Sequence, residues 1–239
     1  MNNKTLTQIM IGAVAFIAGF VAGSLWTENQ LLKSGNTGAV QKQAAKPSDD
    51  GAAVAAGISD MPEVTDEDHI RGAEEPEIYL VEYSDFECPY CNKFHPTMEK
   101  VMEEYGDRVA WVYRHYPLSF HPQAQISAEA SECVAKLGGN DAFWTFTDSL
   151  YKAAAIDGGD ALTKDKLLAA ASNVGVNIQS CLDNEEMADA VTDDFIGGRD
   201  AGVSGTPGTI LVTKDGDGEV ISGALPYSQV KTILDKYLE

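Results

Sequence analysis

The stretch "YSDFECPYCNKFHP", residues 83–96, decides the fold. It overlaps the end of residues 77–86, whose alternating β-branched and aromatic side chains predict a strand. Beyond the motif, apolar residues recur at the spacing of one helical face, at Phe94, Met98, Val101, Met102 and Tyr105. The motif therefore lies at a strand–helix junction. Cys88 falls at the N-cap, and Pro89 falls at the first helical position, where a missing N–H costs nothing.

The rest of the folded part continues this pattern. Residues 108–118, "RVAWVYRHYPL", predict a second strand and complete a βαβ unit. From about 120 to 200 the pattern is helical, with an Asn or Asp cap expected at residues 140–141 and a Thr163 cap further on. "GTILVT" and "GEVISG" then predict a β-hairpin across "KDGDG", and residues 228–238 a terminal helix. The fold class is α/β with an inserted block of helices.

Charge separates the chain into two parts. The formal net charge of the 239 residues is −20, and four basic and four acidic side chains cancel within residues 1–62. The whole acidic excess therefore lies in residues 63–239. Such a surface repels nucleic acid and anionic lipid, so neither is an expected partner of this part.

The N-terminal part predicts a compartment. Residues 9–26 are uncharged and just long enough for a transmembrane helix, with a cleaved signal peptide as the alternative. Residues 27–62 are rich in small and polar residues and read as a flexible linker. The expected division is thus an anchor or signal (1–26), a linker (27–62) and a folded domain (63–239). Either N-terminal reading puts that domain outside the cytoplasm, where disulfides persist.

The position of the two motif cysteines predicts reactivity. Unpaired N–H groups and the helix dipole point at the Cys88 sulfur and favour its thiolate, the form that attacks disulfides. Cys91 is expected to be more buried and to serve as the resolving thiol. A zinc site would need a second ligand pair, and Cys133 and Cys181 stand 48 residues apart, so no metal is expected here. An inert structural disulfide is the other alternative. No cofactor is expected.

At this point the sequence resembles the DsbA family of extracytoplasmic thioredoxin-fold oxidoreductases. The resemblance spans roughly residues 63–239 and rests on "VEYSDFECPYCNKFHP", "YRHYPLSFHPQAQISAEASECV", "DAFWTFTDSLY", "GVSGTPGTILV" and "ISGALPY". It implies a thioredoxin-like fold with an inserted helical domain. The predicted transmembrane helix and linker that precede this fold lie outside the resemblance. It also implies that Cys88 attacks, that Cys91 resolves, and that Pro207 is a cis-proline facing them.

The resemblance implies further residue roles. Glu82 matches a strand acid beneath the active site that tunes proton transfer. Thr206 and Pro207 would hold an extended substrate by backbone hydrogen bonds, next to Pro89 and Tyr90 of the motif, although Thr206-Pro207 taken alone could be a simple turn. Some relatives carry a structural disulfide in the helical insertion, which here would pair Cys133 with Cys181, the alternative being two free buried thiols. The implied partners are exported proteins with free thiols and a quinone-linked membrane reoxidant similar to DsbB or VKOR.

Two features keep other functions open. The dipeptide Pro89-Tyr90 also occurs in glutaredoxins and in the DsbG isomerase, and Thr206 before the proline resembles isomerase or reductase relatives. A disulfide reductase or isomerase, or a chaperone that binds extended peptides without redox turnover, are therefore alternatives. Two further sets have no expected catalytic role: three histidines of the folded part, which precede prolines or lie in a strand, and three aromatic residues of the insertion, which are expected in the core. These are His95, His115 and His121, and Phe143, Trp144 and Phe146.

Overall fold

The structure is a computed structural model that describes residues 60–239. The predicted membrane anchor, residues 9–26, and nearly all of the predicted linker lie outside the described residues. Among residues 60–239, no helix has both the length and the apolar character needed to cross a bilayer.

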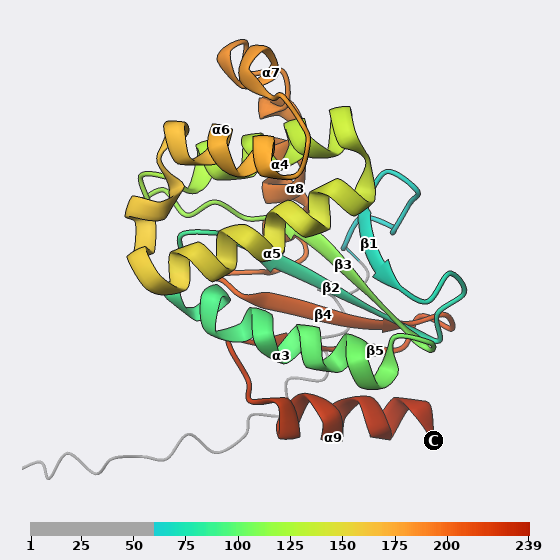
Figure 1. Cartoon of the computed structure of the whole chain (residues 1–239). Coiled ribbons are helices and arrows are strands. Elements are labelled where there is room, and N and C mark those ends of the chain that lie inside the picture. Colours follow the sequence, from blue (N-terminus) through green and yellow to red (C-terminus); the bar gives the residue numbers. More distant parts are fainter. Residues whose placement is uncertain (1–59) are drawn as a thin grey trace, which may run out of the picture. The chain divides into compact units, whose positions relative to one another are not determined.

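One mixed sheet organises the described part (Figure 1). Its strand order is β1-β3-β2-β4-β5, with β2 and β3 parallel and every other neighbouring pair antiparallel. The strands are β1 (His69–Gly72), β2 (Ile78–Ser84), β3 (Val109–His115), β4 (Gly208–Thr213) and β5 (Gly218–Ser222). The parallel pair at the centre is what a βαβ unit requires, because its two strands need a crossover helix between them.

That crossover helix is α3 (Pro89–Tyr105), which begins directly after Cys88. Its buried face carries the predicted apolar residues Phe94, Met98, Val101 and Tyr105, and it ends before Gly106. The predicted hairpin is present as β4 and β5, and the terminal helix is α9 (Tyr227–Leu238). Local sequence pattern therefore predicted the central βαβ unit and the C-terminal hairpin with their boundaries correct to within a few residues.

The helical insertion lies between β3 and β4. Its members are α4 (Ala124–Gly138), α5 (Asn140–Asp157), the 3-10 helix η1 (Gly158–Leu162), α6 (Lys164–Asn173), α7 (Gln179–Asp183) and α8 (Ala188–Asp200). The short elements α7 and η1 were not predicted. The cap predictions were wrong in part: Gly139 is the N-cap of α5, the Asn140 side chain donates to the Ile70 carbonyl oxygen (2.7 Å), and Thr163 caps α6 by position without a side-chain hydrogen bond.

The two faces of the sheet bury separate cores. The larger core joins one face to α3, α9 and the helices α4 to α7 of the insertion, with Leu80, Trp111 and Leu211 among its strand residues. The smaller core lies on the opposite face, around Val81, Val112 and Ile210. Because strand side chains alternate between faces, Glu82 shares the larger core with Leu80. This alternation brings a carboxylate under the N-terminus of α3.

The edge strand β1 was not predicted from the sequence. Its four residues, "HIRG", show no alternation, and its strand conformation follows from antiparallel pairing with β3, where His69 lies opposite Tyr113. Residues just before the predicted boundary at residue 63 also contact the folded part. Met61 packs against the smaller core, and the Pro62 carbonyl oxygen accepts a hydrogen bond from Arg114 (3.0 Å).

Candidate active site

Cys88 is fixed where the predicted strand–helix junction turns into α3. It is the N-cap residue, with extended backbone angles, and Pro89 is the first residue of the helix. The Asn92 N–H donates to the Cys88 carbonyl oxygen (3.0 Å), which is the first hydrogen bond of the helix. The remaining N–H groups of the first turn have no helical partner and point toward the Cys88 side chain.

The environment of Cys88 favours its thiolate. A hydrogen bond from the Cys91 thiol lowers the pKa of Cys88 most, burial opposes it, and the backbone N–H groups of Tyr90 and Cys91 lower it further, to about 5. In its protonated form, the Cys88 thiol donates to the Thr206 carbonyl oxygen at 3.5 Å. The Thr206 hydroxyl also acts to lower the pKa, although it makes no regular hydrogen bond. At neutral pH, Cys88 is therefore a thiolate nucleophile.

Cys91 has the opposite character. It is fully buried, and burial together with the neighbouring Cys88 and Glu82 raises the pKa of the Cys91 thiol well above its ordinary value. Cys91 thus stays protonated when Cys88 is ionised. Both are free cysteines in the structure. One thiolate at a helix N-terminus next to one thiol that stays protonated is the arrangement that an attacking and a resolving cysteine need.

A buried polar network lies beneath the pair. Glu82 Oε1 accepts a hydrogen bond from Ser84 Oγ (2.7 Å), and Ser84 Oγ also contacts the Tyr151 hydroxyl (2.9 Å). The Tyr151 hydroxyl in turn contacts the Tyr113 hydroxyl (2.7 Å). All four side chains are buried. The network joins strands β2 and β3 to helix α5, so the insertion supplies part of the environment of the cysteines.

Glu82 is the acid of this network. Burial is the largest influence and raises the pKa of Glu82 to about 7, against the lowering effects of Ser84 and His95. Its second oxygen, Oε2, has no hydrogen-bond partner among the described residues, and neither does the nearby Trp111 indole N–H. A carboxyl group with this pKa changes protonation near neutral pH. It has the properties of a group that exchanges protons with its surroundings.

The loop before β4 faces Cys88. The peptide bond between Thr206 and Pro207 is cis, as the resemblance implied, and the 3.5 Å contact of Cys88 with Thr206 brings this loop to the sulfur. Pro89 and Tyr90 are exposed, with Tyr90 at 64%. The four residues predicted to meet substrate therefore gather around Cys88, two on the loop and two on the first turn of α3.

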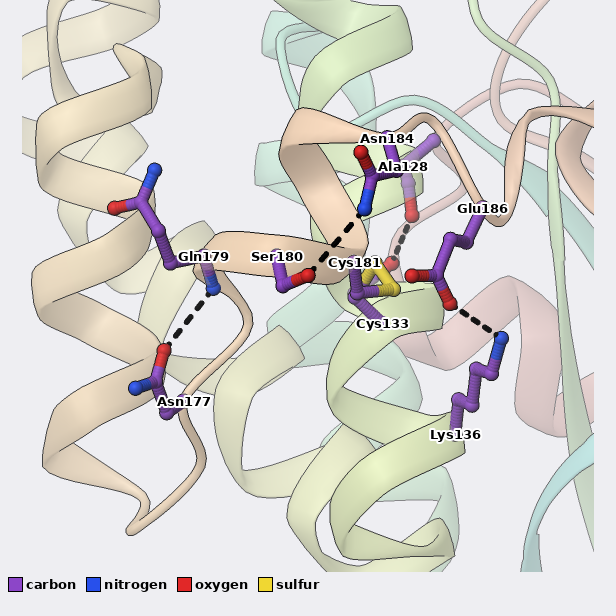
Figure 2. Close-up of a disulfide and its surroundings, with 10 residues drawn as sticks. Ala128, Cys133, Lys136, Asn177, Gln179, Ser180, Cys181, Asn184 and Glu186 are labelled. Atoms are coloured by element: carbon purple, nitrogen blue, oxygen red, sulfur yellow. Dashed lines mark hydrogen bonds and ion pairs between the residues drawn. A yellow bond between two sulfur atoms is a disulfide. The ribbon is translucent and has the colours of Figure 1, made fainter.

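The other two cysteines form a disulfide away from this arrangement. Cys133 of α4 and Cys181 of α7 are bonded, with their Cα atoms 5.9 Å apart, as Figure 2 shows. An ion pair between Lys136 Nζ and Glu186 Oε2 (2.8 Å) flanks it on the surface. The bond ties the short helix α7 to the long helix α4.

The histidines hold structure around the site. His121 Nδ1 contacts Asp85 Oδ2 (2.7 Å), which also accepts from the Leu118 N–H (3.0 Å). Asp85 Oδ1 accepts from the Glu87 N–H (2.8 Å), so one carboxylate fixes the turn that leads into Cys88. His95 contacts Asp148, and His115 contacts Glu132. Phe143, Trp144 and Phe146 are buried in the larger core, as predicted.

Sequence reasoning missed three members of the site. Ser84 had a detectable signal, because it lies two residues after Glu82 on the same strand and therefore on the same face. Tyr113 and Tyr151 had none. Tyr151 meets Ser84 across 67 residues, and only the packing of the insertion against the sheet brings the two together.

Comparison with protein families agrees with the geometry. The family model described as thioredoxin matches residues 64–236. DsbA2 of Pseudomonas aeruginosa is 24% identical with a TM-score of 0.57, over 73% of this chain and 96% of that chain. BdbD of Bacillus subtilis in its oxidised form is 23% identical with a TM-score of 0.64, over 74% and 96%. Alpha-DsbA1 of Wolbachia pipientis is 19% identical with a TM-score of 0.61, over 76% and 95%. These likenesses show a DsbA-like fold.

The curated relatives are much longer proteins. The Na(+)/H(+) antiporter NhaA 3 of Salinispora tropica is 44% identical over 97 residues, which is 39% of this chain and 14% of the antiporter. The Na(+)/H(+) antiporter NhaA of Herminiimonas arsenicoxydans is 30% identical over 171 residues, 70% of this chain and 25% of the antiporter. The chain thus spans a quarter or less of these two relatives.

Proposed function

Because this chain belongs to the thioredoxin family and has a DsbA-like fold, we propose that it is a thiol:disulfide oxidoreductase that introduces disulfides into exported proteins. One observation supports this most strongly. The pKa of Cys88 is lowered to about 5 while that of Cys91, three residues on, is raised well above its ordinary value. A stabilised thiolate stabilises the reduced form, and a protein whose reduced form is stable gives up its disulfide readily.

The transfer consists of two exchanges. A client thiolate attacks Cys88 Sγ of the oxidised pair, the Cys88–Cys91 bond breaks, and Cys91 leaves as a thiolate that takes up a proton. A second client thiolate then attacks the client sulfur of the mixed disulfide and releases Cys88 as a thiolate. The client loses two electrons and two protons. The cysteine pair gains the two electrons, Cys91 gains one proton, and the other proton goes to solvent.

Glu82 is the group suited to supply the proton to Cys91. It is buried beneath the pair, its pKa of about 7 leaves it partly protonated at neutral pH, and it interacts electrostatically with Cys91. Protonating the leaving Cys91 prevents it from attacking back. Ser84 and Tyr151 keep the carboxyl oriented through the hydrogen bonds described above.

The client is held as an extended chain. The loop at Thr206 and Pro207 offers backbone groups beside the Cys88 sulfur. Proline has no backbone N–H, so it cannot donate a hydrogen bond to a neighbouring strand. Tyr90, on the first turn of α3, presents an exposed aromatic ring. Backbone contacts of this kind recognise the extended conformation rather than a particular sequence, which suits a protein with many unfolded clients.

We also propose a compartment and a second partner. The predicted anchor at residues 9–26 would hold the folded domain outside the cytoplasm, where exported thiols meet it. Each turnover leaves the pair reduced, so continued function requires an oxidant. A quinone-linked membrane protein similar to DsbB or VKOR is the class of partner that accepts these two electrons.

The reduction potential of the Cys88–Cys91 pair tests the proposed direction. DsbA lies near about −120 mV and thioredoxin near about −270 mV. We expect a value more positive than about −200 mV, measured on the full chain by equilibration with glutathione buffers and thiol alkylation. A value near that of thioredoxin would overturn the oxidase proposal.

A reductase or isomerase is the second candidate. The observation in its favour is that the Cys88 pKa of about 5 lies between those of DsbA, about 3.5, and thioredoxin, about 7. The same measurement separates the two candidates, because an isomerase or reductase is kept reduced and needs a more negative potential.

A further inference from the structure

A second cluster of ligand-type side chains lies outside the hydrogen-bond network of the cysteines. His69 begins β1, His115 ends β3, and Glu132 lies on α4. His69 Nε2 is 2.6 Å from Glu132 Oε1, and His115 Nε2 is 2.9 Å from the same oxygen. Two imidazole nitrogens from neighbouring strands thus converge on one carboxylate oxygen. Suitable donor atoms of all three side chains lie within 4.8 Å of one another.

The sheet and its packing fix the three side chains. His69 lies opposite Tyr113 in the antiparallel pair, so it shares a face with His115, two residues further along β3. The His69 ring stacks on Phe143 with centroids 3.6 Å apart. His115 and Glu132 are buried. Rings held in this way lose little freedom when they bind a ligand, which is the main cost that preorganisation removes.

An acidic cavity gives access to the cluster. It has a volume of about 390 Å³ and includes His69 and Glu132 in its lining, together with Asp68, Asp193 and Asp194. Arg114 also lines the cavity, but a two-pronged ion pair with Asp68 at 2.7 and 3.0 Å neutralises it. A concave surface with an excess of carboxylates concentrates cations from solution.

We propose that His69, His115 and Glu132 bind a divalent transition-metal ion, with Zn²⁺ as the best match. Two imidazole nitrogens and one carboxylate oxygen, with water as the fourth ligand, are a donor set that zinc accepts at about 2.0–2.1 Å. In a tetrahedral site such ligand atoms lie about 3.3 Å apart. The two nitrogen–oxygen separations, 2.6 and 2.9 Å, are shorter because hydrogen bonds join each imidazole to Glu132. The ion would replace these hydrogen bonds, and each nitrogen would move roughly half an ångström away from the carboxylate oxygen.

The proposal is independent of the cysteine chemistry. The ion would join the edge strand β1, the central strand β3 and helix α4 of the insertion at one point. A second group of similar composition, His95, Glu99 and Asp148, is a poorer match. It offers one imidazole, and Arg71 already donates to Asp148 at 2.8 Å, which brings a cation to the position where the metal would bind.

Metal titration of the full chain tests this inference. The thiols of Cys88 and Cys91 also bind zinc, so the titration is done in a Cys88→Ser/Cys91→Ser background. We expect about one equivalent of Zn²⁺ to bind in calorimetry, and Co²⁺ to bind with visible d–d bands but no thiolate charge-transfer band. Loss of all binding in this background would overturn the proposal, as would Ca²⁺ competing equally with Zn²⁺.

Matched histidine variants locate the site. His69→Ala should weaken Zn²⁺ binding by at least about 100-fold, since even indirect partners of metal ligands cost 10–100-fold. His95→Ala should leave the affinity within about twofold. The reverse result would assign the metal to the other group and refute the proposal. Anomalous scattering at the zinc edge from crystals of the metal-loaded protein gives a readout that does not depend on the variants folding. Zinc density away from His69, His115 and Glu132 would equally refute it.

Discussion

Two pairs of cysteines in this chain have the same burial and different chemistry. Cys88 and Cys181 are 3% and 4% exposed, and Cys91 and Cys133 are both fully buried. Exposure therefore does not distinguish the free pair from the bonded pair. What differs is the surroundings. Cys88 lies at a helix N-terminus beside a carbonyl group and above a buried acid, whereas Cys133 and Cys181 join the sides of two helices.

The comparison shows how one fold keeps two kinds of sulfur chemistry apart. Helix N–H groups and the Cys91 thiol stabilise negative charge on Cys88, and such charge makes a sulfur both a nucleophile and a good leaving group. Cys133 and Cys181 are bonded to each other and do not titrate. The bonded pair closes a separation of 48 residues, so its main effect is on the unfolded chain.

The largest expected effects come from replacing cysteines of one pair while the other pair stays intact. Cys88→Ala should lower disulfide transfer to a reduced peptide by on the order of 10³-fold or more, because the attacking atom is gone. Cys133→Ala/Cys181→Ala should leave transfer within about twofold below its unfolding temperature. The same double variant should lose roughly 4 kcal/mol of stability in guanidinium unfolding, given the loop of 48 residues.

Two results would revise this division of roles between the two cysteine pairs. If the folded Cys133→Ala/Cys181→Ala protein loses transfer activity, the two pairs exchange electrons with each other. If Cys88→Ala loses transfer but still prevents aggregation of an unfolded client as well as wild type, a binding role without redox turnover gains support. A Cys91→Ala variant sharpens the test, because it should accumulate mixed disulfides with clients on Cys88.

The reactive pair should also differ from the bonded pair in its dependence on pH, because Cys88 can ionise. Thiolate absorbance of the reduced protein should rise with a midpoint near pH 5, about four pH units below an ordinary thiol at 9.0. The folded reduced protein therefore binds fewer protons than the unfolded chain between these values. The stability that the Cys88 thiolate contributes should therefore rise with pH between 5 and 9, and it is lost as pH falls through about 5.

The oxidised protein is the matched control for that titration. Its Cys88 does not titrate, so the stability difference between the reduced and oxidised forms should grow from pH 5 to pH 9. A reduced protein whose thiolate appears only near pH 8 or above would mean that the helix terminus and Cys91 do not stabilise the charge. The explanation of the difference between the two pairs would then be wrong.

The reactive pair was predictable from the sequence because its chemistry is local. A strand pattern, Cys88, Pro89 and an apolar helical face define the N-cap within about twenty residues. The family resemblance implied that Glu82 lies beneath the active site, and the structure buries it. Such features depend on backbone geometry that neighbouring residues specify.

The rest of the site depends on contacts between distant segments. Tyr151 reaches Ser84 across 67 residues, and His121 reaches Asp85 across 36. Strand β1, which supplies His69, has four residues and forms because β3 offers it a partner edge. No local sequence pattern predicts these contacts. They follow from how the insertion packs on the sheet, which only the complete structure shows.

The smallest effect is expected from replacing Glu82, the acid that is buried beneath the reactive pair. Burial raises its pKa from 4.5 to about 7, so ionising it in the folded protein costs free energy. The stability from its neutral form is complete below about pH 4.5 and is lost as pH rises through about 7. Relative to Glu82→Gln, the oxidised wild-type protein should therefore lose roughly 2–3 kcal/mol between pH 4.5 and pH 8.5.

Glu99→Gln, which changes an exposed carboxylate on α3, is the control and should follow the wild-type pH profile. Glu82→Gln should also remove the change in transfer rate near pH 7 and leave the Cys88 midpoint near 5, because Glu82 acts on Cys91 and not on the attacking sulfur. A variant that moves the Cys88 midpoint instead would show that the acid tunes the nucleophile directly. The proton it carries would then reach Cys91 from another group, and Tyr151, whose hydroxyl is linked to Glu82 through Ser84, would be the first to replace.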